Sequence, residues 1–126
     1  MGAAALIFVY GTLKRGGCRA ELLAGQRLIG EAATEPRYRM VDCGSYPGLI
    51  NAEAGLSITG ELWAVDADCL KALDLAEGVA EGLYARRPVR LQAPYADELV
   101  EAYFYLPSTA GLRDCGDRWV NAGGGT

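Results

Sequence analysis

The chain has 126 residues, enough for one domain with a hydrophobic core, and its 51% of hydrophobic residues exclude a disordered chain. The 16 acidic and 12 basic residues give a net charge of −4, and the basic residues form no long stripe, so we expect no binding to nucleic acid. The sequence contains no histidine, which excludes Ser-His-Asp and Cys-His relays and removes the commonest zinc ligand.

No apolar run approaches the roughly 18–20 residues that a membrane-spanning helix needs. The apolar segment 3–9 lacks the basic residues of a signal peptide and is interpreted as a first strand. The cysteines are spread along the chain without a C-x-x-C pair, which favours reduced thiols over two disulfides. These features predict a cytoplasmic protein with no membrane partner and no bound metal.

The first predicted strand, residues 4–10, leads directly into a short loop that begins at Gly11 and contains Lys14 and Arg15. A glycine after a strand lets the backbone turn sharply and approach a ligand without a Cβ atom in the way. Successive N–H groups in such a turn can hold an anion. The segment is therefore either an ordinary turn or the first half of a ligand site.

Between this loop and residue 65 the sequence predicts one short helix and three strands. Residues 18–25 are typical of a short helix that Gly25 ends at its C-cap. Residues 43–49 combine glycine and proline and are interpreted as a turn. Alternation of side chains predicts strands at residues 26–34, 37–42 and 57–65.

The clearest predicted helix covers residues 66–77, with Asp66 as its N-cap and Gly78 after its end. Glu77 lies on the same helical stripe as Leu70 and Leu73, so its carboxylate faces the core or a cavity. Burial there would raise its pKa toward the range that a general base needs. Two alternatives remain open: Glu77 swings out to solvent, or it pairs with an arginine such as Arg86. Asp74 lies off the stripe and is the weaker candidate, and Glu81 is interpreted as a surface charge.

Two aromatic and β-branched runs, residues 83–92 and 98–106, predict long final strands. About six strands with two short helices indicate an α+β domain, and such numerous strands favour closure into a small mixed β-barrel that hides their edges. We expect a single domain over residues 1–120. The glycine-rich residues 121–126 are expected to be a disordered tail.

Four sequence blocks give the chain a resemblance to a known family. Residues 10–16 (YGTLKRG), 46–49 (YPGL), 60–65 (GELWAV) and 73–78 (LDLAEG, followed by Tyr84) occur in the order and spacing of the γ-glutamylcyclotransferase-like family, also called AIG2-like or butirosin-G-like. Cys115 to Trp119 is a loose echo of its terminal G-D-W motif. The resemblance spans residues 7 to about 119. It implies that family's fold, a mixed β-barrel of about six strands.

The resemblance also implies an activity, in which the α-amine of a γ-glutamyl group attacks its own γ-carbonyl and releases 5-oxoproline and an amine. Glu77 would be the catalytic carboxylate that moves protons. The backbone amides of the loop would hold the substrate's carboxylate or polarise its γ-carbonyl, and Tyr10 and Tyr84 would complete the site. The substrate-binding residues implied in this way are Tyr10, Gly11, Thr12, Leu13 and Tyr84.

Other interpretations remain open at this point. The domain is alternatively a catalytically idle barrel that binds a small metabolite or a protein, or a γ-glutamyl hydrolase in which water replaces the internal amine. Lys14 and Arg15 either contact the acidic part of the donor or are solvated loop charges, and Tyr46 and Tyr105 are either pocket walls or packing residues. We expect a monomer, a small-molecule substrate and no cofactor.

Overall fold

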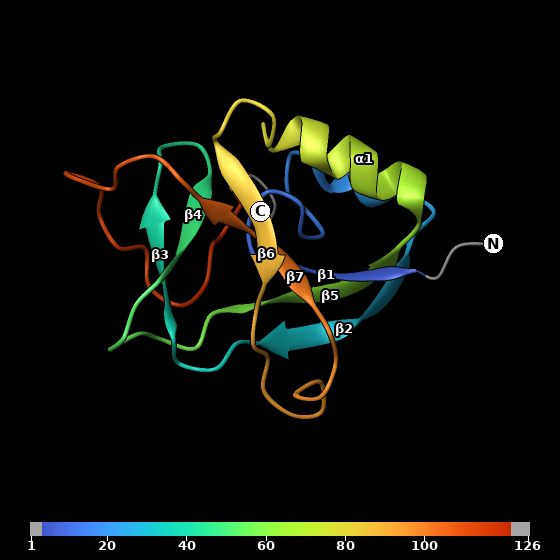
Figure 1. The fold of residues 1–126 in the computed structure, drawn as a ribbon, viewed down its shortest axis with the longest axis horizontal. Helices are drawn as coiled ribbons and strands as arrows, with labels where there is room; N and C mark the ends of the chain where they lie inside the picture. Colours follow the sequence, from blue (N-terminus) through green and yellow to red (C-terminus); the bar gives the residue numbers. More distant parts are fainter. Residues whose placement is uncertain (1–3, 122–126) are drawn as a thin grey trace.

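A computed structural model of the protein describes residues 4–121 and consists, over that range, of one curved sheet with one α-helix packed against it (Figure 1). The elements follow one another as β1 (Ala5–Val9), the 3-10 turn η1 (Ala20–Leu23), β2 (Arg27–Ala33), β3 (Tyr38–Asp42), β4 (Pro47–Asn51), β5 (Thr59–Val65), α1 (Ala67–Ala76), β6 (Tyr84–Pro88) and β7 (Glu101–Tyr105). The predicted α+β class is confirmed.

The strands form one mixed sheet in the order β2-β5-β1-β7-β4-β3, with β6 paired to β7. β1 runs antiparallel to β5, from Ala5 opposite Val65 to Val9 opposite Glu61, and parallel to β7. β1 is therefore an inner strand. The loop that follows Val9 consequently starts from the middle of the sheet, where neighbouring strands fix its position.

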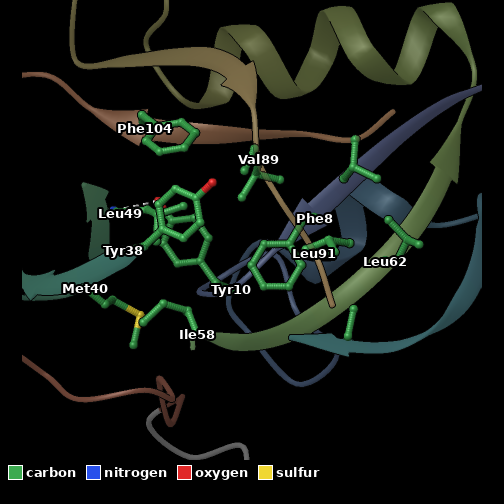
Figure 2. Close-up of a cluster of buried hydrophobic side chains, with 13 residues drawn as sticks. Phe8, Tyr10, Tyr38, Met40, Leu49, Ile58, Leu62, Val89, Leu91 and Phe104 are labelled. Atoms are coloured by element: carbon green, nitrogen blue, oxygen red, sulfur yellow. Dashed lines mark hydrogen bonds between the residues drawn. The ribbon is translucent and has the colours of Figure 1, made fainter. Parts of the chain in front are cut away.

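The sheet curls around a first hydrophobic core, part of which is drawn in Figure 2. Ala32 of β2 and Tyr38 of β3 come from opposite ends of the strand order and yet belong to this same buried cluster. Phe8 and Tyr10 stack within it, with ring centroids 6.4 Å apart. Fully burying a side chain such as Phe8 contributes roughly 1.5–3 kcal/mol, so the curl of the sheet is stabilised from inside.

Figure 1 shows α1 packed along one side of the sheet. A second core of buried side chains lies between them. Ile7 and Val9 of β1 point to this face, because successive residues of a strand alternate sides. Leu73 of α1 packs against them and is fully buried. The predicted caps of α1 are confirmed: the side chain of Asp66 accepts a hydrogen bond from the N–H of Cys69, and Gly78 has the positive φ of a helix-ending residue.

The prediction of a closed barrel needs correction. Within residues 4–121 the sheet contains seven strands and stays open between β2 and β3. Irregular segments protect its two ends instead, because Leu91 bridges to Thr34 beyond β2 and Asp114 bridges to Val41 in β3. Covering an edge in this way removes the need for closure.

The segment predicted as a turn, residues 43–49, contains the beginning of β4. Pro47 is tolerated because it is the first residue of the strand, where its missing N–H matters least. Gly48 is required by packing, because a Cβ atom there would lie 2.7 Å from Cβ of Tyr105. Both residues look like turn formers locally, and their strand conformation comes from tertiary contacts.

Other boundaries also differ from the predictions. The helix expected at residues 18–25 is the single 3-10 turn η1, since Arg19 at its N-cap makes no side-chain cap bond and so short a helix is costly to nucleate. The strand expected at residues 83–92 ends at Pro88, which lacks an N–H for the ladder. The tail expected at residues 121–126 lies outside the described residues except for Asn121.

Candidate active site

Tyr10 fixes the point at which the first loop leaves β1. Its ring is buried, and its hydroxyl donates a hydrogen bond of 2.6 Å to the carbonyl of Tyr103 in β7. The same hydroxyl accepts a hydrogen bond of 3.0 Å from the N–H of Leu49 in β4. Tyr10 thus connects the end of β1 to two neighbouring strands, and its hydroxyl is already engaged in the free protein.

The loop backbone presents three N–H groups without a partner. Within residues 4–121 the N–H groups of Gly11, Thr12 and Leu13 donate no hydrogen bond, whereas the carbonyls of Gly11 and Thr12 accept from Lys14 and Arg19. Gly11 is required here by close packing, because a Cβ atom would lie 2.6 Å from Cγ of Pro47. These free donors are suited to an anion or to a polarised carbonyl oxygen.

The charged residues of the loop are used to anchor it from behind. Arg15 donates two hydrogen bonds to the buried carboxylate of Glu61, from its backbone N–H at 3.1 Å and from Nε at 3.0 Å. Lys14 donates from Nζ to the carbonyl of Trp119 at 2.7 Å, and Asn121 donates from Nδ2 to the carbonyl of Gly11. Lys14 and Arg15 line a separate surface cavity, so they hold the loop and do not face the candidate site.

Glu77 follows α1 as its C-cap residue, and its side chain is only 12% exposed. The guanidinium of Arg19, which lies just before η1, donates from Nη1 to Glu77 Oε2 at 3.0 Å and to the carbonyl of Ala76 at 2.7 Å. Of the two alternatives left open by the sequence, exposure to solvent is wrong, because Glu77 is turned inward. Pairing with an arginine is confirmed, but the arginine is not Arg86, which pairs with Asp74 and Glu101. The partner of Glu77 is Arg19.

The second carboxylate oxygen of Glu77 remains available. Oε1 accepts no hydrogen bond from the described residues, and no fully buried side-chain oxygen or nitrogen among them lacks a partner. Oε1 therefore keeps contact with solvent or the cavity. Burial raises the pKa of the Glu77 carboxyl above the ordinary 4.5, although the charge of Arg19 and its hydrogen bond oppose the rise. A carboxylate whose pKa burial has raised is better suited to accept and return a proton than an exposed one.

Aromatic side chains form the rest of the wall. The hydroxyl of Tyr84 donates to the carbonyl of Pro47 at 2.6 Å, so it makes no hydrogen bond to Glu77 in this structure. Burial, with added effects from Tyr10 and Glu77, raises the pKa of Tyr84, which keeps its hydroxyl neutral. Tyr46 lines the cavity, whereas Tyr105 packs edge-on against Tyr84 from behind.

All six site residues expected from the sequence lie on one cavity. It has a volume of about 30 Å³ and is bordered by the loop, by the end of α1 and by β6 and β7. A volume of this size holds roughly two water molecules. The six expected residues are Glu77, Tyr10, Gly11, Thr12, Leu13 and Tyr84.

Two residues on or beside this cavity were missed by sequence reasoning. Arg19 lies 58 positions from Glu77, and no local pattern connects them. Tyr103 lines the cavity and donates from its hydroxyl to Asp74 at 2.7 Å, which Arg86 also holds. The alternation of residues 98–106 was the one signal available, since it places Tyr103 on the helix-facing side of β7.

The described residues contain no group of three or more histidine, cysteine, aspartate or glutamate side chains that could hold a metal ion. Among the helices within residues 4–121, none has the length and hydropathy to cross a membrane.

Comparison with known proteins agrees with the architecture and motifs of this site. Residues 7–122 match the family described as gamma-glutamyl cyclotransferase, AIG2-like. A Vibrio cholerae protein provisionally named gamma-glutamylcyclotransferase is 35% identical over 112 residues, which cover 89% of this chain and 93% of that protein. Human gamma-glutamylaminecyclotransferase is 36% identical over 126 residues, covering 83% of this chain and 80% of its own. The crystal structure of a mouse AIG2-like protein superposes with a TM-score of 0.70 at 28% identity, covering 86% of this chain and 80% of that one. The chain therefore belongs to the AIG2-like γ-glutamylcyclotransferase family.

Proposed function

We propose that this cavity binds the γ-glutamyl group of a small donor and releases 5-oxoproline and an amine from it. One observation carries the proposal: the largely buried carboxylate of Glu77, with an accessible oxygen, borders the same cavity as the three unpaired N–H groups of residues 11–13. A proton acceptor and a set of fixed donors are the two parts that an intramolecular acyl transfer needs.

The proposed reaction balances without an enzyme nucleophile. Glu77 removes a proton from the donor's α-ammonium, and the resulting amine attacks the γ-carbonyl carbon to form a five-membered ring with a tetrahedral centre. Glu77 then gives that proton to the leaving nitrogen, the bond between the γ-carbon and that nitrogen breaks as the carbonyl re-forms, and the amine departs. The ring nitrogen still carries a second proton, which it loses through Glu77 to the departing amine, so that Glu77 is again ionised. The absence of histidine from the sequence is compatible with this route.

Orientation and electrostatics supply the rest of the proposed catalysis. Holding the glutamyl chain folded places its own amine beside its own carbonyl, and such intramolecular orientation lowers barriers substantially. The loop N–H groups are held in place before the substrate arrives, because Glu61 and Pro47 fix the backbone around Gly11 and Arg15. Preorganised donors of this kind contribute about 3–4 kcal/mol each to stabilising a developing oxyanion.

The test is Glu77→Gln, which keeps the size of the side chain and removes the proton acceptor. We expect 5-oxoproline release from a panel of γ-glutamyl amines and amino acids to fall about 10²- to 10⁴-fold. The temperature of unfolding should change little, because the substitution removes a carboxylate whose pKa burial has raised. Glu81→Gln is the matched control, since Glu81 is exposed in the turn after α1.

The product distinguishes the competing functions. Release of free glutamate in place of 5-oxoproline would indicate a hydrolase, and binding without either product would indicate an idle domain. Turnover of Glu77→Gln near the unmodified rate would rule out the assigned role. A variant that loses both turnover and folding would show that Glu77 is structural.

A further inference from the structure

Arg19 and Glu77 place opposite charges side by side on the wall of the cavity. Both residues border it, and Nη1 of Arg19 lies 3.0 Å from Oε2 of Glu77. Among the described residues that line the cavity, Arg19 is the one cation and Glu77 the one carboxylate. The side chain of Arg19 is 43% exposed, so it can be reached from solvent and can move.

The guanidinium has unused donors. Nη1 serves both the carbonyl of Ala76 and the carboxylate of Glu77, whereas Nε and Nη2 donate to none of the residues in the range 4–121. An arginine presents its donors as a planar fork that matches a carboxylate with two parallel hydrogen bonds. Arg19 can therefore bind a second carboxylate while Nη1 keeps its contact with the end of α1.

We propose that Arg19 and Glu77 together recognise the α-amino-acid end of the donor, with Arg19 binding its α-carboxylate and Glu77 its α-ammonium. This inference rests on the proposed function. An α-amino acid carries the two opposite charges on one carbon atom, and the protein presents the complementary pair at contact distance. The substrate class is then a γ-glutamyl compound with a free α-carboxylate.

The assignment also divides the work within the site. With the α-carboxylate on Arg19, the N–H groups of residues 11–13 are left for the γ-carbonyl oxygen. The other cations of the loop do not compete, because Lys14 is bound to the carbonyl of Trp119 and Arg15 to Glu61. Arg19 thus selects the substrate and positions it for the proton transfer to Glu77.

Two matched donors test the inference: a γ-glutamyl amine, and the same compound with its α-carboxylate converted to a primary amide. Both keep the α-amine and the γ-carbonyl, so both can cyclise and release the same amine. In Arg19→Gln we expect kcat/KM for the carboxylate donor to fall roughly 10- to 100-fold, which is the worth of a hydrogen-bonded charge. The value of kcat/KM for the amide donor should change less than about threefold. For the carboxylate donor, kcat/KM of Arg19→Lys should lie between that of the unmodified protein and that of Arg19→Gln.

Arg39→Gln is the control, because Arg39 is also half-exposed and paired to a carboxylate, Asp114, but lies away from the cavity. It should leave both donors unaffected. If Arg19 only holds Glu77 or the end of α1, Arg19→Gln will lower kcat/KM for both donors equally, and the inference is wrong.

A failure of the proposed function remains distinguishable. If the unmodified protein cyclises neither donor, the same two compounds are unreactive ligands, and calorimetric titration measures their binding. Preferential binding of the carboxylate compound that disappears in Arg19→Gln would support recognition by Arg19. Equal binding of the two compounds, or no binding, would overturn it.

Discussion

Glu61 in β5 and Glu77 after α1 are two largely buried glutamates. Each forms an ion pair with an arginine from the same segment, residues 15–19. Their side chains are 9% and 12% exposed, and each lies 3.0 Å from a guanidinium nitrogen, of Arg15 and Arg19 respectively. Residue type, burial and ion pairing are therefore nearly the same at the two positions. The remaining hydrogen bonds differ.

Glu61 is fully engaged by donors. It accepts from the backbone N–H and Nε of Arg15 and from the indole N–H of Trp63, so both oxygens are occupied. Glu77 accepts from Arg19 through Oε2, and its Oε1 has no partner among the described residues. Hydrogen-bond saturation, more than burial, therefore separates a carboxylate that holds a loop from one that is available for chemistry.

The largest difference between the two glutamates is expected in the free energy of unfolding of Glu61→Gln and Glu77→Gln, measured in parallel. At Glu61 the amide removes the charged hydrogen bond to Arg15 and places an N–H group against its donors. Because a hydrogen bond to a charged group contributes about 1.5–3 kcal/mol, the free energy of unfolding should fall by about 2 kcal/mol. Urea unfolding at neutral pH measures both variants. Equal losses at Glu61 and Glu77 would contradict the distinction.

The pH dependence of activity gives the next largest effect. In the proposed reaction Glu77 must be ionised to accept a proton. Because burial raises its pKa above 4.5, kcat/KM should fall as the pH drops through a value above 4.5. Below that value the rate should decrease about tenfold per pH unit, equivalent to about 1.4 kcal/mol. A pH profile of 5-oxoproline release measures it. An acidic limb at or below 4.5 would show that Glu77 is not the group being titrated.

The carboxyl of Glu77 also makes folding stability depend on pH, in the direction opposite to activity: a rise in pH should increase the rate and lower the stability. Since the folded state raises the pKa of Glu77, it binds the proton more tightly than the unfolded chain. The stability that this group contributes is present below pH 4.5 and is lost as the pH rises through the folded pKa. In Glu77→Gln this decline should be absent, and in Glu61→Gln it should remain, which gives a second reading of the same pair of variants.

Local signals explain which parts of the structure were predictable. The caps of α1 are encoded by Asp66 and Gly78, next to the turns that they close. The helical spacing from Leu73 placed Glu77 on the buried side, and the run of residues 4–10 placed the following loop at the end of a strand. Each of these inferences needs only a few neighbouring residues.

Long-range contacts explain the parts that were not predictable. The Arg19–Glu77 pair joins positions 58 residues apart, and its arginine precedes a 3-10 turn that the sequence presents as a helix. β4 was hidden because Pro47 and Gly48 are turn formers by themselves, and its strand conformation comes from pairing with β3 and β7 and from the packing of Tyr105 against Gly48. Sheet closure was likewise decided by segments that cover the two ends of the sheet.

Glu31→Gln should have the smallest effect on stability. It tests whether an arginine partner is enough to make a glutamate important for stability, or whether the glutamate must also be buried. The carboxylate of Glu31 lies 4.0 Å from Nη2 of Arg15, the same residue that binds Glu61, but its side chain is 77% exposed. Exposed ion pairs contribute about 0–1 kcal/mol because water screens them. Glu31→Gln should therefore lower the free energy of unfolding by less than about 0.5 kcal/mol, measured by urea beside Glu61→Gln. A loss as large as that at Glu61 would mean that the charge of Arg15, and not the burial and saturation of its partner, decides which carboxylate holds the loop.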